Sequence, residues 1–137
     1  MKKIFILDDI PARHKNIRAF LQANNPSETF TFHSAQTFDE GTDLIREHEF
    51  DLLCLDHDLG DFDPETATPD TGFSGYSGGA GRFLDGRDFC HWLIQRGTKI
   101  AAVWVHSWNP VGADRMVKIL TDSGVTNITR KEAPGDI

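Results

Sequence analysis

Short apolar segments alternate with helical patterns along almost the whole chain, and this alternation constrains the fold more than any other feature. The apolar runs have the length typical of strands that are covered on both faces, and they occupy positions 3–7, 29–33, 51–55, 99–105 and 125–129. Apolar residues at helical spacing lie between them, at 10–23, 37–48, 85–97 and 109–124. Such alternation requires right-handed crossovers, which predicts a three-layer α/β fold with a five-stranded parallel sheet and helices on both faces.

Residues that favour helix ends support these boundaries. Thr37 and Glu40 have the spacing of a capping box, and Asp85 is placed to cap the third helix. Asn109 followed by Pro110 is a strong helix start, and glycines follow the third and fourth helices.

Size and composition narrow the class of protein further. The 137 residues fit a single domain spanning 1–137, and the two cysteines lie in apolar segments, which suits a reduced, cytoplasmic protein. No stretch approaches 18 apolar residues, so no membrane span is expected. A formal net charge of −7 argues against binding duplex DNA by charge alone.

The segment 61–84 interrupts the alternation. It is rich in aspartate and glycine and has no helical period. Loops of this length inside compact domains are usually functional or disordered. We expect either a lid over the end of the third strand or a surface insertion.

Ionisable and polar residues follow four of the five predicted strands. Each group comes directly after the apolar run, at residues 8–9, 56–58, 106–109 and 130–131. Parallel strands bring these ends to one edge of the sheet, where converging carboxylates repel one another unless a cation lies between them. Aspartate oxygens suit a hard ion such as Mg²⁺. The sequence therefore predicts a metal site that accepts a phosphate.

In its order of motifs, the chain resembles the receiver domain of bacterial response regulators. That resemblance implies a doubly wound, flavodoxin-like sheet of strand order 2-1-3-4-5, and it implies that Asp9 and Asp56 ligate the metal. Asp8 would lie alongside, and the Asp58 carbonyl would be a third ligand. By the same resemblance Asp56 is the phosphoacceptor position. Two further positions match, with Ser107 as a hydroxyl donor to phosphoryl oxygens and Lys131 as the lysine of the site.

Several positions depart from signalling receivers. His57 replaces an apolar residue after Asp56, bulky Trp108 follows Ser107, and Glu132 replaces a proline. Too few residues follow Lys131 for the final helix, so one face of the sheet is expected to be bare. Trp104 or a second subunit in a homodimer would then cover it.

The LDHDLG and HSWN motifs resemble instead a receiver-derived family described as cyclic-phosphate-processing. This resemblance implies a phosphoesterase acting on a cyclic nucleotide or a 2′,3′-cyclic phosphate RNA end, with Mg²⁺ or Mn²⁺ as cofactor. Opening a cyclic phosphate needs an acid and a base, and histidine performs both roles near neutral pH. His57 and His106 are the candidates, and the metal and Lys131 would neutralise phosphoryl charge.

Other positions near these strand ends have two interpretations each. Arg13 would reach the substrate or lie on a solvated helix face, and Trp108 would stack on a base or pack at the rim. Asn109 would bind substrate or only cap its helix. Two other functions stay open for the chain, a stand-alone receiver phosphorylated on Asp56 and a non-catalytic binder of a cyclic nucleotide or phosphorylated ligand.

Overall fold

The predicted parallel sheet is present in the structure, a computed structural model that describes residues 1–59, 61–62 and 83–134. Its five strands are all parallel and lie in the order β2-β1-β3-β6-β7, which confirms the predicted order 2-1-3-4-5. The strands are β1 (Lys2–Leu7), β2 (Phe30–Ala35), β3 (Leu52–Leu55), β6 (Val103–Val105) and β7 (Ile128–Arg130).

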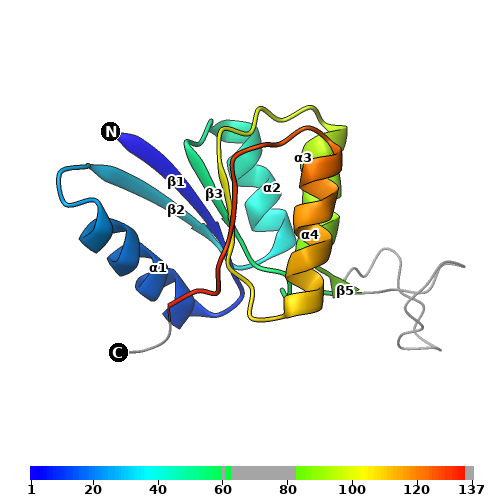
Figure 1. The fold of residues 1–137 in the computed structure, drawn as a ribbon, viewed down its shortest axis with the longest axis horizontal. Coiled ribbons are helices and arrows are strands. Elements are labelled where there is room, and N and C mark those ends of the chain that lie inside the picture. The colour runs from blue at the N-terminus through cyan, green and yellow to red at the C-terminus, as the bar shows by residue number, and fades with distance from the viewer. Residues whose placement is uncertain (60, 63–82, 135–137) are drawn as a thin grey trace, which may run out of the picture.

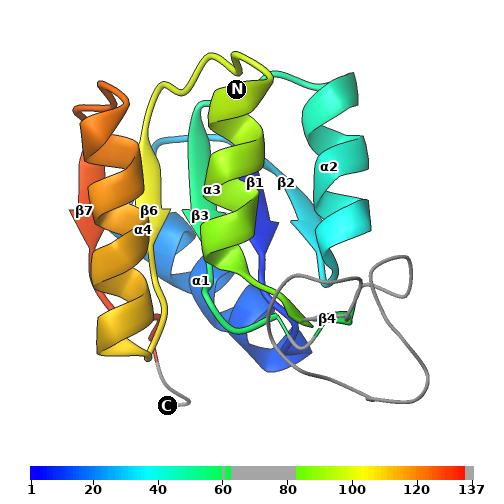
Figure 2. The ribbon, with the colours of Figure 1, turned by 90° about the vertical axis from the view of Figure 1, so that its right-hand side faces the viewer.

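Four helices cover the two faces of this sheet. They are α1 (Pro11–Asn24), α2 (Phe38–Glu47), α3 (Gly86–Gln95) and α4 (Pro110–Asp122). Helix α1 lies on one face, and α2, α3 and α4 lie on the other (Figure 1 and Figure 2). None of the helices in the described ranges has an apolar stretch long enough to cross a bilayer.

The predicted helix caps form as the sequence indicates. Thr37 and Asp85 each close a capping box at the start of α2 and α3, and the Asn109 side chain accepts a hydrogen bond from the backbone of α4. After α3 and α4 the chain turns at Gly97 and Gly124, both with positive φ, a conformation that glycine adopts without steric cost.

Each face of the sheet has its own apolar core. On the side of α2, α3 and α4 the rings of Phe5 and Phe89 stack, with centroids 5.7 Å apart. On the side of α1 a smaller core gathers around Ile6, Ile17 and Trp104. Both faces of β1 are therefore buried, which explains its continuous apolar sequence.

The face expected to be bare near the last strands is covered at Trp104, which is 5% exposed. Its ring packs against Phe20 of α1, and Ala133 belongs to the same core. The indole N–H donates to the Lys131 carbonyl, so the segment after β7 folds back over this face (Figure 1). With Trp104 covered within the chain, the homodimer through this face stays a prediction.

The ends of the segment 61–84 pair with each other. Strands β4 (Asp61–Phe62) and β5 (Phe83–Leu84) form a two-stranded antiparallel sheet. Both belong to the connection between β3 and α3. Residues 63–82 lie outside the described residues, and so does the predicted lid. The fourth main strand is shorter than expected, because β6 begins at Val103 and not at Lys99.

Candidate functional site

The register of the sheet brings four strand ends into one row. Leu7 lies opposite Leu55, Leu55 opposite Val105, and Val105 opposite Arg130. The residue after each strand therefore emerges at the same edge. As a result Asp8, Asp56 and His106, which are far apart in the sequence, become neighbours.

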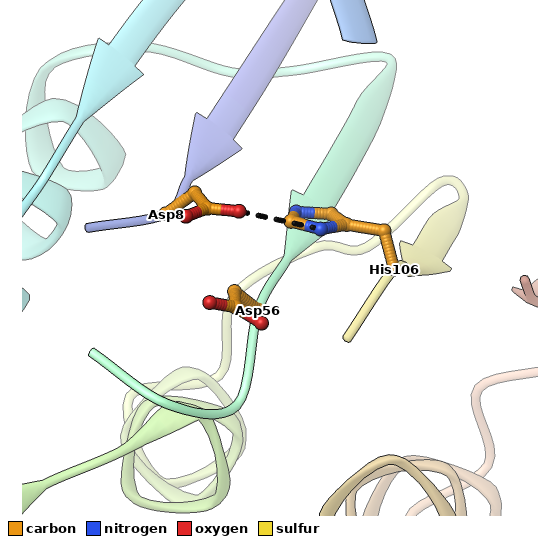
Figure 3. Close-up of side chains that lie close together, drawn as sticks. All are labelled: Asp8, Asp56 and His106. Carbon is orange, nitrogen blue, oxygen red and sulfur yellow. Dashed lines mark ion pairs between the residues drawn. The ribbon is translucent and has the colours of Figure 1, made fainter. Parts of the chain in front are cut away.

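These three side chains form a compact buried cluster, which we call the Asp-Asp-His cluster. One donor atom from each, a carboxylate oxygen or a ring nitrogen, lies within 4.8 Å of the others. The Nδ1 atom of His106 is 3.6 Å from Oδ2 of Asp8. All three residues are at most 1% exposed, and Figure 3 shows them around a common space at the ends of β1, β3 and β6.

Burial makes the two carboxylates hard to ionise. It raises the pKa of Asp56 to about 7, and repulsion from Asp8 acts in the same direction. Burial likewise raises the pKa of Asp8 to about 6. Arg13 acts in the opposite direction, because its Nη1 lies 3.4 Å from Asp56 Oδ2 and 3.7 Å from Asp8 Oδ2. One guanidinium thus faces two carboxylates.

Burial acts in the opposite sense on His106. It lowers the pKa of this imidazole to about 3, so the ring is neutral around pH 7. The ring is fully buried and has no hydrogen-bond partner on either nitrogen. It therefore offers a free lone pair inside the cluster.

The donor atoms of the cluster fit a divalent cation. Asp8 Oδ2 and Asp56 Oδ1 are also buried without a hydrogen-bond partner. Leaving a buried polar atom unsatisfied costs about 1–3 kcal/mol. A cation bound to Asp8, Asp56 and His106 would satisfy these atoms at once.

His14 supports the cluster from α1, a role that the sequence interpretation missed. It is 3% exposed, and its Nε2 lies 2.7 Å from the Asp8 carbonyl oxygen. A hydrogen bond there fixes the backbone from which the Asp8 carboxylate projects. The only sequence signal is a histidine one turn into a helix, on the side that faces the sheet.

His57 lies in a different environment, although it directly follows Asp56. Its Nδ1 is 2.8 Å from Oδ1 of Asp58, and its Nε2 is 3.6 Å from Oδ2 of Asp85 at the cap of α3. The ring also packs on Gly112 of α4, where an added Cβ would lie 2.4 Å from it. His57 therefore ties the end of β3 to the first turns of α3 and α4.

A hollow of about 260 Å³ opens beside the cluster. Its lining comes from the same sheet edge and from the starts of α1 and α4, and consists of Asp9, Ile10, Arg13, Asp58, Trp108 and Asn109. Arg13 belongs both to the hollow and to the ion pairs with the buried carboxylates. Trp108 is 55% exposed at the rim.

Two predicted site residues have other contacts. Ser107 is buried, and its hydroxyl accepts a hydrogen bond from the Asn109 backbone, 3.0 Å away. The Nζ of Lys131 lies 5.1 Å from the ring centroid of Phe20, a cation–π geometry. Within the described ranges Lys131 makes no ion pair with Asp8 or Asp56, and Arg13 is the cation beside them.

Solved structures with the same fold are receiver domains. A CheY-like response regulator receiver domain protein from Methanospirillum hungatei superposes with a TM-score of 0.62 at 16% identity, covering 99% of this chain and 84% of that one. A response regulator from Burkholderia pseudomallei, solved with a phosphorylated aspartic acid, calcium ion and citrate, gives 0.61 at 16% identity. That match covers 99% of this chain but only 62% of that protein.

A third structure is the response regulator TrrA from Thermotoga maritima in complex with Mg²⁺-BeF. Its TM-score is 0.55 at 16% identity, and the match covers 96% of this chain and 88% of that one. At these identities the likeness establishes the fold alone. Among curated proteins, no sequence similar to this chain was found.

The sequence profile of one family matches most of the chain. The profile is described as the cyclic-phosphate processing receiver domain, and it matches residues 3–122. This range includes the Asp-Asp-His cluster and every residue that lines the hollow. The chain therefore belongs to the cyclic-phosphate processing receiver domain family.

Proposed function

We propose that this protein is a metal-dependent phosphoesterase that opens a cyclic phosphate on a nucleotide or an RNA end. The observation that carries the proposal is the hollow beside the Asp-Asp-His cluster, with Arg13 between the two. The guanidinium of Arg13 is suited to a phosphate, because it presents paired donors to two oxygens. The family of the chain points to the same class of substrate.

Asp8, Asp56 and His106 would hold the cation, and the hollow would hold the substrate. When bound, the cation supplies positive charge that stabilises the phosphoryl oxygens in the transition state. Arg13 binds a phosphoryl oxygen from the other side. Trp108 stacks on the base at the rim, where its ring is exposed, and Asn109 lies next to it.

Hydrolysis requires one proton to leave water and one to reach the departing oxygen. Water adds to phosphorus, one of the two ester P–O bonds breaks, and the alkoxide formed takes up a proton. The Asp58 carboxylate lines the hollow and is hydrogen-bonded to the His57 ring. We therefore assign proton transfer to this pair. His106 is less suited to that role, because burial keeps it neutral.

The test is turnover of 2′,3′-cyclic AMP with Mn²⁺ or Mg²⁺, followed by ³¹P NMR. We expect conversion to a phosphomonoester, and Arg13→Met should lower kcat/KM by about 10²–10³. Lys118→Met removes a cation that pairs with Asp122 on the surface of α4, and it serves as the matched control. Saturable binding without turnover would contradict the esterase and leave a nucleotide binder.

A phosphorylated receiver is the second candidate, because a structure with this fold carries a phosphorylated aspartic acid. The receiver resemblance implies that Asp56 is the corresponding position. Acetyl phosphate with Mg²⁺ separates the two functions: a stable adduct on Asp56, seen by intact mass, supports signalling. Against it, Asp56 is 1% exposed, which leaves little access for a phosphodonor.

A further inference from the structure

The His106 ring is a buried polar group for which the protein provides no partner. Its backbone is fixed on both sides, because the N–H donates to Leu55 and the carbonyl accepts from Ala133. The ring is 0% exposed, yet neither nitrogen has a hydrogen bond. Buried imidazoles without partners are rare, since leaving a buried nitrogen without a hydrogen bond costs free energy. A ligand that accepts a nitrogen lone pair removes this cost.

The nearest carboxylate oxygen lies too far from the ring for an ordinary hydrogen bond. The 3.6 Å between His106 Nδ1 and Asp8 Oδ2 is longer than the 2.7–3.2 Å typical of N–H···O bonds. Asp8 Oδ2 and Asp56 Oδ1 are likewise without hydrogen bonds. A nitrogen and two carboxylates thus surround one point, with donor atoms within 4.8 Å of one another.

We propose that the Asp-Asp-His cluster is a mixed nitrogen–oxygen site that selects a transition-metal dication, of the Mn²⁺, Fe²⁺ or Zn²⁺ class, over Mg²⁺, with His106 as a direct ligand. Mg²⁺ prefers oxygen donors in strict octahedral geometry, whereas imidazole suits zinc and iron. This site differs from the all-oxygen magnesium site expected from Asp8, Asp9, Asp56 and the Asp58 carbonyl. The inference does not depend on the reaction, because it concerns only which ion is bound and by which atoms.

The contacts around Asp8 hold its carboxylate toward the cluster. Ligating groups are usually held by further hydrogen bonds that fix their orientation. Asp8 has such support: its Oδ1 accepts from the Ile10 backbone at 2.8 Å, and its carbonyl contacts His14. The other oxygen, Oδ2, is left for the cluster. Trp104 lies beside His106, with an angle of 71° between the ring planes, and fills the space on that side.

The test compares metal affinities in the absence of substrate. Chelator-treated protein is titrated with Zn²⁺, Mn²⁺ and Mg²⁺ by calorimetry, and with Co²⁺ by visible absorption as a probe of nitrogen ligation. We expect Zn²⁺ and Co²⁺ to bind at least about 100-fold more tightly than Mg²⁺. His106→Gln, which replaces nitrogen by an amide oxygen, should reduce Zn²⁺ and Co²⁺ affinity at least about tenfold. Mg²⁺ affinity should change less than about threefold.

His33→Gln is the matched control, because His33 is another histidine with a buried ring nitrogen that lacks a hydrogen bond, and its ring packs against His48 and Phe50. Its ratio of zinc to magnesium affinity should equal that of the wild type. An unchanged ratio in folded His106→Gln would overturn the proposal. If that variant does not fold, ¹⁵N spectra of the wild-type imidazoles decide: zinc should shift a His106 ring nitrogen. Shifts confined to other histidines would refute the assignment. Neither outcome depends on esterase turnover.

Discussion

His57 and His106 follow neighbouring strands of the same sheet, yet they differ in burial and in hydrogen-bond partners. His57 is partly exposed, and its two nitrogens face Asp58 and Asp85. His106 is completely buried, and neither of its nitrogens has a hydrogen bond, although one ring nitrogen lies within 4.8 Å of oxygens from Asp8 and Asp56. A histidine with partners is explained by the fold, whereas His106, with neither ring nitrogen hydrogen-bonded, is the basis of the metal site proposed above. A histidine that follows a strand at this edge can therefore be either a structural residue or a candidate ligand, depending on its contacts.

The largest expected effect is the loss of metal affinity when Asp56, a carboxylate of the cluster, is replaced. Asp56→Asn should weaken Zn²⁺ binding at least about 100-fold, because a charged ligand is lost. The same change should stabilise the metal-free protein at pH 8, on the order of 2 kcal/mol, since burial raises the pKa of Asp56. Calorimetry and chemical denaturation measure the two effects. A large loss of metal-free stability would show that Asp56 is a structural residue.

The next largest effect is on stability, through the packing of the His57 ring against Gly112. Gly112→Ala should destabilise the fold by about 1–3 kcal/mol, because its Cβ would lie 2.4 Å from the His57 ring. Adding His57→Ala should remove the clash, so the double variant should be more stable than the sum of the single effects predicts. Zinc affinity should stay within about threefold in both backgrounds. Strict additivity in urea denaturation would show that the ring is not held against α4.

A pH series separates the carboxylates from other titrating groups. Burial raises the pKa of Asp56 to about 7 in the folded state, so the group favours folding at low pH and loses this contribution as the pH rises through 7. Between pH 6.5 and 8 the free energy of unfolding of the metal-free wild type should fall by about 1 kcal/mol relative to Asp56→Asn. Saturating Zn²⁺ should remove this difference. Parallel profiles without metal would mean that Asp56 titrates normally.

The smallest effect compares the two cations near the site. Arg13→Met should tighten Zn²⁺ binding several-fold, because the guanidinium competes for the same carboxylates at 3.4 and 3.7 Å. Lys131→Met is the control, and it should leave zinc affinity within about twofold, because its ammonium lies over Phe20. If Lys131→Met had the larger effect, the lysine would reach the carboxylates as the receiver resemblance implies.

The fold was predictable because local signals and global topology agree. The apolar runs, the capping boxes and the alternation of strand and helix predicted a parallel α/β sheet, and the receiver resemblance implied its strand order. The register then brings Asp8, Asp56 and His106 together. Knowing which residue follows each strand is therefore enough to predict that these three side chains lie near one another. The boundaries of β6 were less predictable, because its apolar run continues back through residues that the structure places before the strand.

The contacts of individual side chains could not be predicted from the sequence. Both histidines follow a buried strand, and much of the difference between them comes from other elements: besides its neighbour Asp58, His57 contacts Asp85 and Gly112. Long-range contacts also decide which cation lies at the carboxylates. The ammonium of Lys131, expected at the site, lies over the ring of Phe20, and the first turn of α1 brings Arg13, for which two positions were open, to the carboxylates. Such long-range contacts have no periodicity that a single sequence reveals.

The most direct measurement is anomalous diffraction from crystals of the metal-free protein soaked in Zn²⁺. We expect a strong peak within about 2.5 Å of a His106 ring nitrogen and of carboxylate oxygens from Asp8 and Asp56. A peak bound by aspartates alone, or one at His57 with none in the cluster, would contradict the proposed site.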